Sequence, residues 1–291
     1  MRKWNSTLGA ALASLAVAAS LQAAASDATP FGSLSRDDKI AKYYPAADAG
    51  DPFAQSVVGS ALIETGRKGD LERGEQLLLK SAGQGYDLAI FALGSLYRYN
   101  SKLRDPMKSI FWLSKGAEAG DASTQWALGS VYFDGAGVPA DYRKALYWFT
   151  KAAQQGDVDA QNALGNMYLE GKGVPRQYDK AIPWLRKAAT QGKPRALRSL
   201  GHCYELGLGV SKSTAAAHVL YNLALAAGEE EASEALSRVE LKLPAAQISV
   251  AQRLAATWVK GRPLPIPGPS AKSPDSQATP AARQQKPDLT T

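Results

Sequence analysis

The sequence predicts an all-α solenoid of about five helix–loop–helix repeats, with helical caps at both ends. Two observations predict it. One pattern of residues occurs twice within residues 121–192, and the two copies align after a shift of 36 positions. Glycines also recur 35 or 36 residues apart in two registers: Gly59, Gly94, Gly129, Gly165 and Gly201 in one, and Gly50, Gly85, Gly120, Gly156, Gly192 and Gly228 in the other. A fixed period of roughly 20–50 residues is typical of stacked units that bury their apolar faces against one another.

The N-terminal residues predict export. After Arg2 and Lys3, the chain runs from Leu8 to Ala25 without a charge and ends in small residues that a signal peptidase accepts. We expect residues 1–25 to be a cleaved signal peptide and the mature protein to be periplasmic or secreted, without stable membrane insertion. An uncleaved, Ala-rich membrane anchor is the alternative. The net charge of +7 is not clustered in runs, so nucleic acid is not an expected partner.

A short lead and a capping helix are expected over residues 26–50, starting near Ser35, which is placed to cap a helix N-terminus. Five full repeats are expected over 51–228, each reading as helix A, a loop, helix B and a terminal glycine. In the fourth copy we place helix A at roughly 159–169 and helix B at roughly 178–190, because apolar residues recur there every three or four positions.

Aromatic residues repeat at one position of each helix and are therefore predicted to be core. The helix A ladder is Tyr97, Tyr132, Tyr168 and Tyr204, with Leu62 in the first copy; the helix B ladder is Trp112, Trp148 and Trp184, with Leu77 and Leu220 at the ends. The loops carry Gly-x-Gly-Val at 135–138, 171–174 and 207–210. These loops join helix to helix and lack a following Lys-Ser/Thr, so they indicate a tight turn and not a phosphate site.

Two capping helices are expected over 229–260, where the repeat pattern has ended. Residues 261–291 contain seven prolines and no aromatic residue, which predicts a disordered, partly polyproline tail.

The repeated pattern includes Ala127-Leu-Gly-Ser-Val-Tyr132, Gly135-Ala-Gly-Val138 and Lys144-Ala-Leu-Tyr-Trp148. It resembles the Sel-one-like repeat family, relatives of tetratricopeptide repeats with a longer interhelical loop. The resemblance runs from Asp51 to about Gly228. It implies a right-handed α-superhelix that binds other proteins. It also implies that exported bacterial members act as adaptors in envelope assembly, secretion, signalling or host contact.

The residue types that support catalysis are sparse. His202 and Cys203 are neighbours on a helix, so their side chains diverge by about 100° and are poorly placed to share a metal. Cys203 falls between apolar positions and is predicted to be a buried small hydrophobe. No nucleophile triad, carboxylate pair or phosphate loop has meaningful spacing. We therefore expect no enzyme, no cofactor and no metal site.

A second face of helix A is predicted to bind the partner. With Gly129 as position eight, positions two, five, nine and twelve lie opposite the buried ladder, and in related superhelical repeats this stripe lines the concave groove. The predicted partner-binding residues are Phe91, Arg98, Trp126, Phe133, Asn162, Asn166, Arg195, Arg198 and His202. Asn162 and Asn166 could hold the backbone of an extended peptide, and Arg195 and Arg198 a carboxylate. Superhelical curvature or the tail covering this stripe is the alternative.

The leading hypothesis is a non-catalytic interaction scaffold or adaptor in the bacterial envelope, which binds a protein or peptide in its concave groove. The alternative is an envelope enzyme or accessory factor acting on peptidoglycan or polysaccharide. A polar, carboxylate-lined groove would favour that alternative, whereas the predicted groove is aromatic and basic. A third hypothesis is a structural spacer that joins two complexes.

Overall fold

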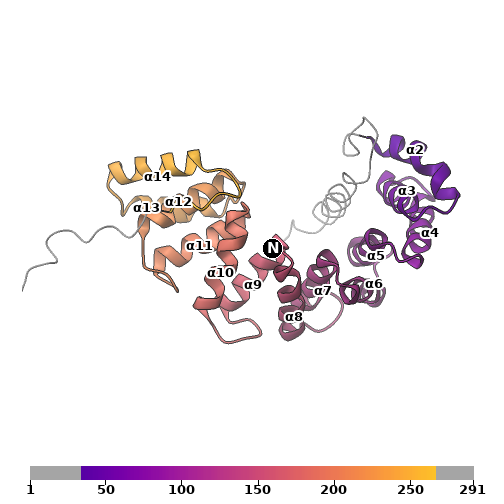
Figure 1. Cartoon of the computed structure of the whole chain (residues 1–291), viewed down its shortest axis with the longest axis horizontal. Coiled ribbons are helices and arrows are strands. Elements are labelled where there is room, and N and C mark those ends of the chain that lie inside the picture. The colour runs from indigo at the N-terminus through magenta and orange to yellow at the C-terminus, as the bar shows by residue number, and fades with distance from the viewer. Residues whose placement is uncertain (1–33, 267–291) are drawn as a thin grey trace, which may run out of the picture.

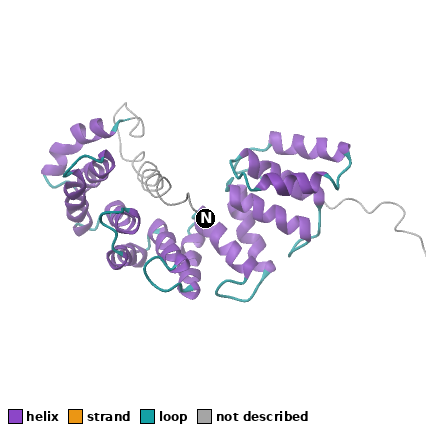
Figure 2. Ribbon diagram, turned by 180° about the vertical axis from the view of Figure 1, so that it is seen from behind, coloured by secondary structure: helices purple, strands orange, loops and turns teal. Residues whose placement is uncertain are grey.

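The computed structural model describes residues 34–266, and every regular element in this range is a helix (Figures 1 and 2). The helices are α2 (Arg36–Asp48), α3 (Pro52–Thr65), α4 (Asp70–Gly83), α5 (Asp87–Tyr99), α6 (Pro106–Ala119), α7 (Ala122–Asp134), α8 (Tyr142–Gln154), α9 (Val158–Glu170), α10 (Tyr178–Thr190), α11 (Pro194–Leu206), α12 (Thr214–Ala226), α13 (Ala232–Glu240) and α14 (Ala245–Thr257). The expected signal peptide and most of the expected tail lie outside the described residues.

The helices pair along the chain, so the predicted all-α solenoid is confirmed. Helices α3, α5, α7, α9 and α11 are the A helices, and α4, α6, α8, α10 and α12 are the B helices that pack on them. The stack bends into an arc, in which α3, α5 and α7 lie on the inner side and α4, α6 and α8 on the outer side (Figure 1). The arc therefore offers two different surfaces, one made by each set of helices.

Side-chain caps set where the helices begin. Asp51, Asp121 and Asp157 each accept a hydrogen bond of 2.7 Å from the backbone N–H three residues further on. Asp141 and Ser213 accept longer bonds, of 3.0 and 3.2 Å, from the equivalent N–H groups at the starts of α8 and α12. The first N–H groups of a helix have no partner within it, so an oxygen at this position stabilises the helix by about 1 kcal/mol.

The in-helix glycine register brings the two helices of a repeat together. A Cβ on Gly129 would lie 2.7 Å from the Phe149 ring, and one on Gly165 would lie 2.7 Å from the Leu185 side chain. Such distances leave no room for a side chain at these glycines. Each A helix can therefore approach its B helix closely, and the residue facing the glycine is the centre of the repeat.

The helix B core ladder is displaced by one residue from the prediction. Leu113, Phe149 and Leu185 are at most 2% exposed, whereas the tryptophans that precede them, Trp112, Trp148 and Trp184, are only partly buried. Neighbouring residues on a helix point about 100° apart, so only one of each pair can face the glycine. The prediction that the tryptophans form the core rungs is wrong. They border the core from outside.

The helix A ladder is also less buried than predicted. Tyr97 is buried, but the equivalent tyrosines of the later repeats, Tyr132, Tyr168 and Tyr204, are partly buried. Leu128 and Leu164, which lie one turn before the tyrosines, are fully buried. On these A helices the deepest apolar burial thus comes from aliphatic side chains, and the tyrosine rings close the edge of the repeat.

The Gly-x-Gly loops also connect one repeat to the repeat before it. The second glycine, Gly173, has a φ of 76°, and a Cβ there would lie 2.8 Å from the backbone of Tyr142, the first residue of the preceding B helix. A Cβ on Gly209 would lie 2.8 Å from the Cβ of Tyr178 and 3.0 Å from its backbone. Glycine is required both for the left-handed backbone and for the close approach. The loop is therefore a turn, as predicted, and an inter-repeat contact as well.

The C-terminal end closes the stack beyond the last repeat. Helices α13 and α14 pack on α12. Leu264 and Ile266 pack against the same apolar cluster as Trp258, and the Gly261 N–H donates to the Thr190 carbonyl at 2.8 Å. The packed chain thus continues past residue 261, where the sequence had predicted the start of a disordered tail.

Candidate interaction surface on the A helices

The predicted partner-binding residues lie on four successive A helices, α5, α7, α9 and α11. Because the repeats are 35 or 36 residues long, equivalent positions form a file from one helix to the next. The predicted residues differ in how far their side chains are exposed to solvent. His202 is exposed, while Trp126, Phe133, Asn166, Arg195 and Arg198 are partly exposed. Phe91, Asn162 and the Arg98 side chain are at most 9% exposed.

Two of these residues connect α5 to the next repeat. Phe91 packs in the apolar cluster that contains Leu113 and Leu128. The Arg98 guanidinium donates to Asp134 Oδ2 at 2.7 Å and to the Ala127 carbonyl at 3.3 Å. These contacts engage both side chains within the chain itself, so neither presents a free surface to a partner. The sequence predicted that Phe91 and Arg98 would be open to a partner, whereas the structure buries both side chains.

Trp126 and Phe133 form the aromatic part of the surface on α7. The Trp126 ring packs against the apolar clusters on both sides of its repeat. The Phe133 ring lies edge-on to Tyr142, with 5.3 Å between ring centroids, and Lys172 Nζ lies 5.1 Å from the Phe133 centroid. Each ring is held in place by its buried side and keeps part of its area open, which suits an apolar contact with a partner.

Asn162 and Asn166 lie one turn apart on α9 and are already paired. Asn166 Nδ2 donates to Asn162 Oδ1 at 3.2 Å. A primary amide has two N–H donors and an oxygen with two lone pairs, so this single bond leaves hydrogen-bonding capacity in the pair. The bond orients the Asn166 amide, the more exposed of the two.

Arg195 and Arg198 hold a carboxylate that belongs to the same chain. Arg198 Nε donates to Glu229 Oε1 at 2.7 Å, and Arg195 Nε lies 3.9 Å from Glu229 Oε2. The Glu229 side chain is buried beside the arginines, which stay partly exposed. The two arginines therefore gather around a carboxylate, as predicted, but the one that occupies them is internal.

The perturbed acids and thiol of this region have structural roles. Burial raises the pKa of the Cys203 thiol to about 11, which makes it a weak nucleophile at neutral pH. Burial also raises the pKa of Asp157 to about 6, and this carboxylate caps α9. Hydrogen bonds from Arg238 lower the pKa of Glu205 to about 2. Within residues 34–266, no three His, Cys, Asp or Glu side chains are grouped to hold a metal.

Glu205 is the residue of this face that the sequence placed least well. It occupies position twelve of the fifth A helix, where an open groove position was expected. Its carboxylate is instead buried and accepts two hydrogen bonds of 2.9 Å from Arg238 and one of 2.9 Å from the Tyr221 hydroxyl. Arg238 lies on α13, outside the repeat pattern, so the repeat alone could not identify this partner.

Comparisons with known proteins agree with this architecture. A family model for the Sel1 repeat matches residues 52–86, 87–121, 122–157, 158–193 and 194–229. Among solved structures, a protective antigen of uropathogenic Escherichia coli with an SLR fold superposes with a TM-score of 0.73 at 28% identity, covering 98% of this chain and 58% of its own. This chain thus spans somewhat over half the length of that protein.

A Sel1 repeat protein from Oxalobacter formigenes superposes with a TM-score of 0.61 at 24% identity, covering 77% of this chain and 96% of its own, which shows a shared fold. A search of curated proteins finds no match. No helix in the described range has the length and apolar character needed to span a membrane. Sel1 repeats generally serve as protein–protein interaction modules and are typically non-catalytic. With five successive matches over more than half of its length, the chain belongs to the Sel1 repeat family.

Proposed function

We propose that this protein is a non-catalytic interaction scaffold of the bacterial envelope, which binds an extended segment of a partner protein along its A helices. One observation carries the proposal. Successive A helices present aromatic, amide and guanidinium side chains in a single file, and from α7 to α11 these side chains are partly or fully exposed apart from the buried Asn162. Partly exposed aromatic and arginine side chains on a rigid surface are the residue types that dominate protein interfaces.

Each part of the file has a distinct role in the proposed complex. Trp126 and Phe133 contact apolar side chains of the partner, since their rings are fixed by packing and lose little freedom on binding. Asn166, whose amide is oriented by the buried Asn162, hydrogen-bonds the partner's main chain. Arg198, with Arg195, binds a partner carboxylate, which exchanges with the internal Glu229.

The envelope location rests on the sequence of residues 1–25, which has the order of a secretory signal. The similar protein of uropathogenic Escherichia coli is a protective antigen, and a place in the envelope is compatible with that description.

Site-directed photo-crosslinking in living cells tests the surface directly. A benzophenone-bearing phenylalanine analogue replaces Phe133 on α7 in one strain and Leu241 after α13 in a control strain. Leu241 is 90% exposed and lies on none of the A helices. We expect a discrete crosslinked adduct from position 133 that is missing from position 241. Adducts from position 241 alone, or from neither position, would reject the A-helix surface.

A further inference from the structure

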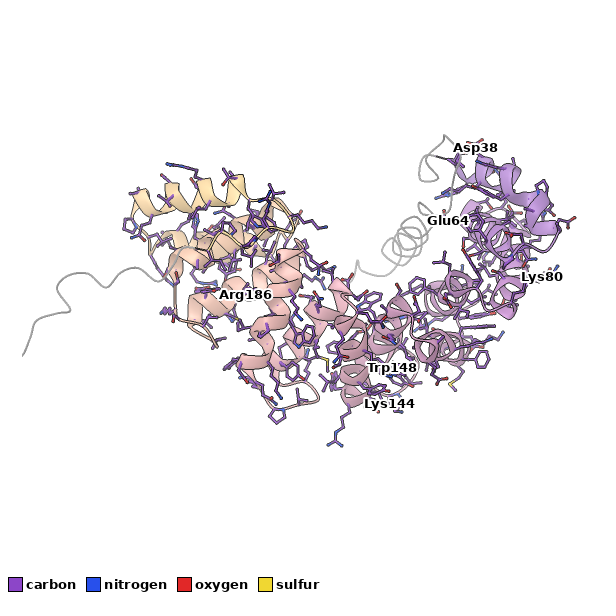
Figure 3. All side chains as sticks on the ribbon, viewed as in Figure 1. Asp38, Glu64, Lys80, Lys144, Trp148 and Arg186 are labelled. Carbon is purple, nitrogen blue, oxygen red and sulfur yellow. The ribbon has the colours of Figure 1, made fainter. Side chains whose placement is uncertain are left out.

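The outer face of the B helices repeats a cation–aromatic arrangement that the proposed function does not use. On α6, α8 and α10, a lysine lies over the tryptophan that precedes it by three residues. The distances from Nζ to the ring centroid are 5.4 Å for Lys115 and Trp112, 5.4 Å for Lys151 and Trp148, and 4.3 Å for Lys187 and Trp184. The label of Trp148 stands at the outer side of the arc in Figure 3.

A second lysine in each of these helices lies over a tyrosine of the preceding A helix. Nζ is 5.1 Å from the ring centroid for Lys108 and Tyr97, 5.0 Å for Lys144 and Tyr132, and 5.8 Å for Lys180 and Tyr168. Among these six lysines, Lys144 is the one with an ion pair to a carboxylate of the described chain, at 3.7 Å from Asp141. Aromatic rings thus hold a row of positive charges that internal acids neutralise only in part.

Large apolar side chains are exposed between these charges. Met107 and Phe111 on α6 are 68% and 61% exposed, and Tyr147 on α8 is 52% exposed. The Phe111 ring lies edge-on to Trp112, with centroids 5.2 Å apart, and Tyr147 lies edge-on to Trp148 at 4.9 Å. In soluble proteins, a cluster of large apolar side chains that are exposed to solvent is typical of an interaction surface.

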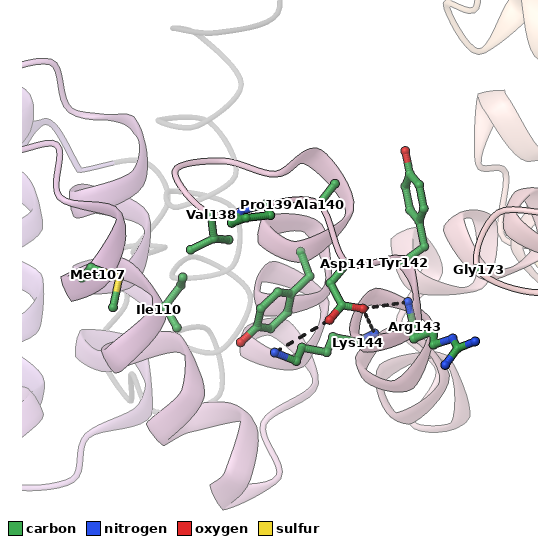
Figure 4. Close-up of a pocket in the computed structure, with 11 residues that line it drawn as sticks. Met107, Ile110, Val138, Pro139, Ala140, Asp141, Tyr142, Arg143, Lys144 and Gly173 are labelled. Carbon is green, nitrogen blue, oxygen red and sulfur yellow. Dashed lines mark hydrogen bonds and ion pairs between the residues drawn. The ribbon is translucent and has the colours of Figure 1, made fainter.

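A hollow of about 730 Å³ opens between α6, α8 and the loop that joins α7 to α8 (Figure 4). Ile110, Tyr132 and Val138 supply apolar wall, and Arg143 and Lys144 stand at its cationic side. The hollow is large enough for one bulky side chain of a partner. Acidic residues next to that side chain in the partner would then lie beside Arg143 and Lys144. We define the outer strip as this hollow together with the six lysines and with Met107, Phe111 and Tyr147.

We propose that the outer strip is a second docking surface, and that its occupant is an acidic protein segment with a bulky apolar residue that enters the hollow. Charge complementarity selects the acidic residues, since a row of lysines on an exposed face attracts carboxylates and repels basic segments. The hollow selects a protein segment over a lipid surface. A bilayer supplies charge and apolar depth, but it has no projecting side chain to fill a defined cavity.

The second surface uses other residues than the A-helix file, and the two meet where Phe133 of the file contacts Tyr142 at the hollow. In the first half of the stack, A helices line the inside of the arc and B helices the outside (Figure 1). Two partners can therefore bind at once without competing for the same residues. A protein with both surfaces connects two partners at a fixed separation, which goes beyond binding a single segment.

Peptide display on the full-length chain tests the occupant. A random-peptide library is selected on the wild-type protein and on a Lys144→Glu/Lys151→Glu variant. We expect the wild type to enrich peptides with Asp and Glu around a large apolar residue. Synthetic copies of these peptides should bind the variant at least about tenfold more weakly, with a smaller salt dependence. Phe111→Ser should weaken the same peptides with the salt dependence retained.

A matched control changes two exposed lysines outside the strip, as Lys68→Glu/Lys212→Glu. This variant has the same net charge as the test variant and should bind the peptides as the wild type does. Trp126→Ala should also leave their binding unchanged, which separates this surface from the proposed function. Enriched peptides without acidic residues, the absence of enrichment, or equal binding by the strip variant would overturn the proposal. Binding to phosphatidylglycerol vesicles that only the strip variant loses, without peptide enrichment, would assign the strip to lipid instead.

Discussion

The ring of Phe149 lies directly against Gly129, so that a Cβ on the glycine would come within 2.7 Å of the ring. Gly129→Ala forces the ring or the two helices apart, and we expect it to destabilise the protein by about 1–3 kcal/mol. Thermal and denaturant unfolding measure the change. Gly83→Ala is the matched control, because a Cβ on Gly83 would meet nothing within 4 Å and Gly83 is in the ordinary helical conformation of α4. Equal melting temperatures for Gly129→Ala and the wild type would show that the helices are not in close contact there.

The displacement of the helix B ladder can be tested at two neighbouring residues. Phe149→Ala removes a fully buried ring and should cost about 3–5 kcal/mol. Trp148→Ala removes a larger ring that is only partly buried and should cost less. Because coupling in repeat proteins is to the nearest neighbour, hydrogen exchange in Phe149→Ala should rise most in the third and fourth repeats. A larger loss of stability from Trp148→Ala would restore the tryptophan ladder as the core.

The buried Glu205 predicts how stability depends on pH. Its pKa is held at about 2 in the folded protein, below its ordinary value of 4.5, mainly by hydrogen bonds from Arg238. The folded state therefore favours the charged carboxylate. This contribution is present above pH 4.5 and is lost as the pH falls from 4.5 towards 2. Unfolding measured against pH should show this loss in the wild type and a much weaker loss in Glu205→Gln.

At neutral pH, Glu205→Gln should itself be less stable by about 1–3 kcal/mol, because Arg238 loses a charged acceptor. Asp157 acts in the opposite direction, since its pKa is raised from 3.8 to about 6 by burial. Its contribution to stability falls as the pH rises through that range. Asp157→Asn removes the pH dependence that comes from Asp157. The two variants together therefore separate the contributions of Glu205 and Asp157 to the change of unfolding free energy with pH.

On the A-helix face, Trp126→Ala should weaken partner binding by about 2 kcal/mol with a smaller effect on folding than Phe149→Ala. Arg195→Glu should weaken binding as well, with a dependence on ionic strength that Trp126→Ala lacks. Both are measured by affinity capture from envelope extract, with a melting curve for each variant. Unfolding of Trp126→Ala would identify that ring as core. Folded variants that both retain the partner would exclude this face.

Export predicts a new N-terminus. If residues 1–25 are a signal peptide, mass spectrometry of the protein from the envelope should find a chain that begins near Ser26. A protein that starts at Met1 or Arg2 in the membrane fraction would instead indicate an uncleaved anchor.

The repeat itself could be predicted because its signals are local. The glycine registers and the apolar spacing of residues such as Leu164 and Leu185 fix helix pairs within one repeat. The rotation of the B helices could not be predicted, since Trp148 and Phe149 are both large and apolar. Which of them faces Gly129 depends on the contact between two helices.

The same reason limits the prediction of the A-helix surface. Trp126 and His202 lie at partly or fully exposed positions, in line with the open stripe. Arg98, by contrast, binds Asp134 of the next repeat, a partner 36 residues away. Contacts between repeats decide which members of a periodic stripe stay open. Those contacts depend on residues that vary from copy to copy.

The loop glycines give the solenoid a direction of assembly. Gly173 of the fourth repeat rests on Tyr142 of the third, and Gly209 of the fifth rests on Tyr178 of the fourth. Each loop thus docks backwards, onto a helix start that precedes it in the chain. During synthesis, the docking site of every new repeat has already been made when its loop appears, so the stack can lengthen from the N-terminus without waiting for later residues. A chain interrupted between repeats should therefore leave a shorter folded stack instead of an unfolded one.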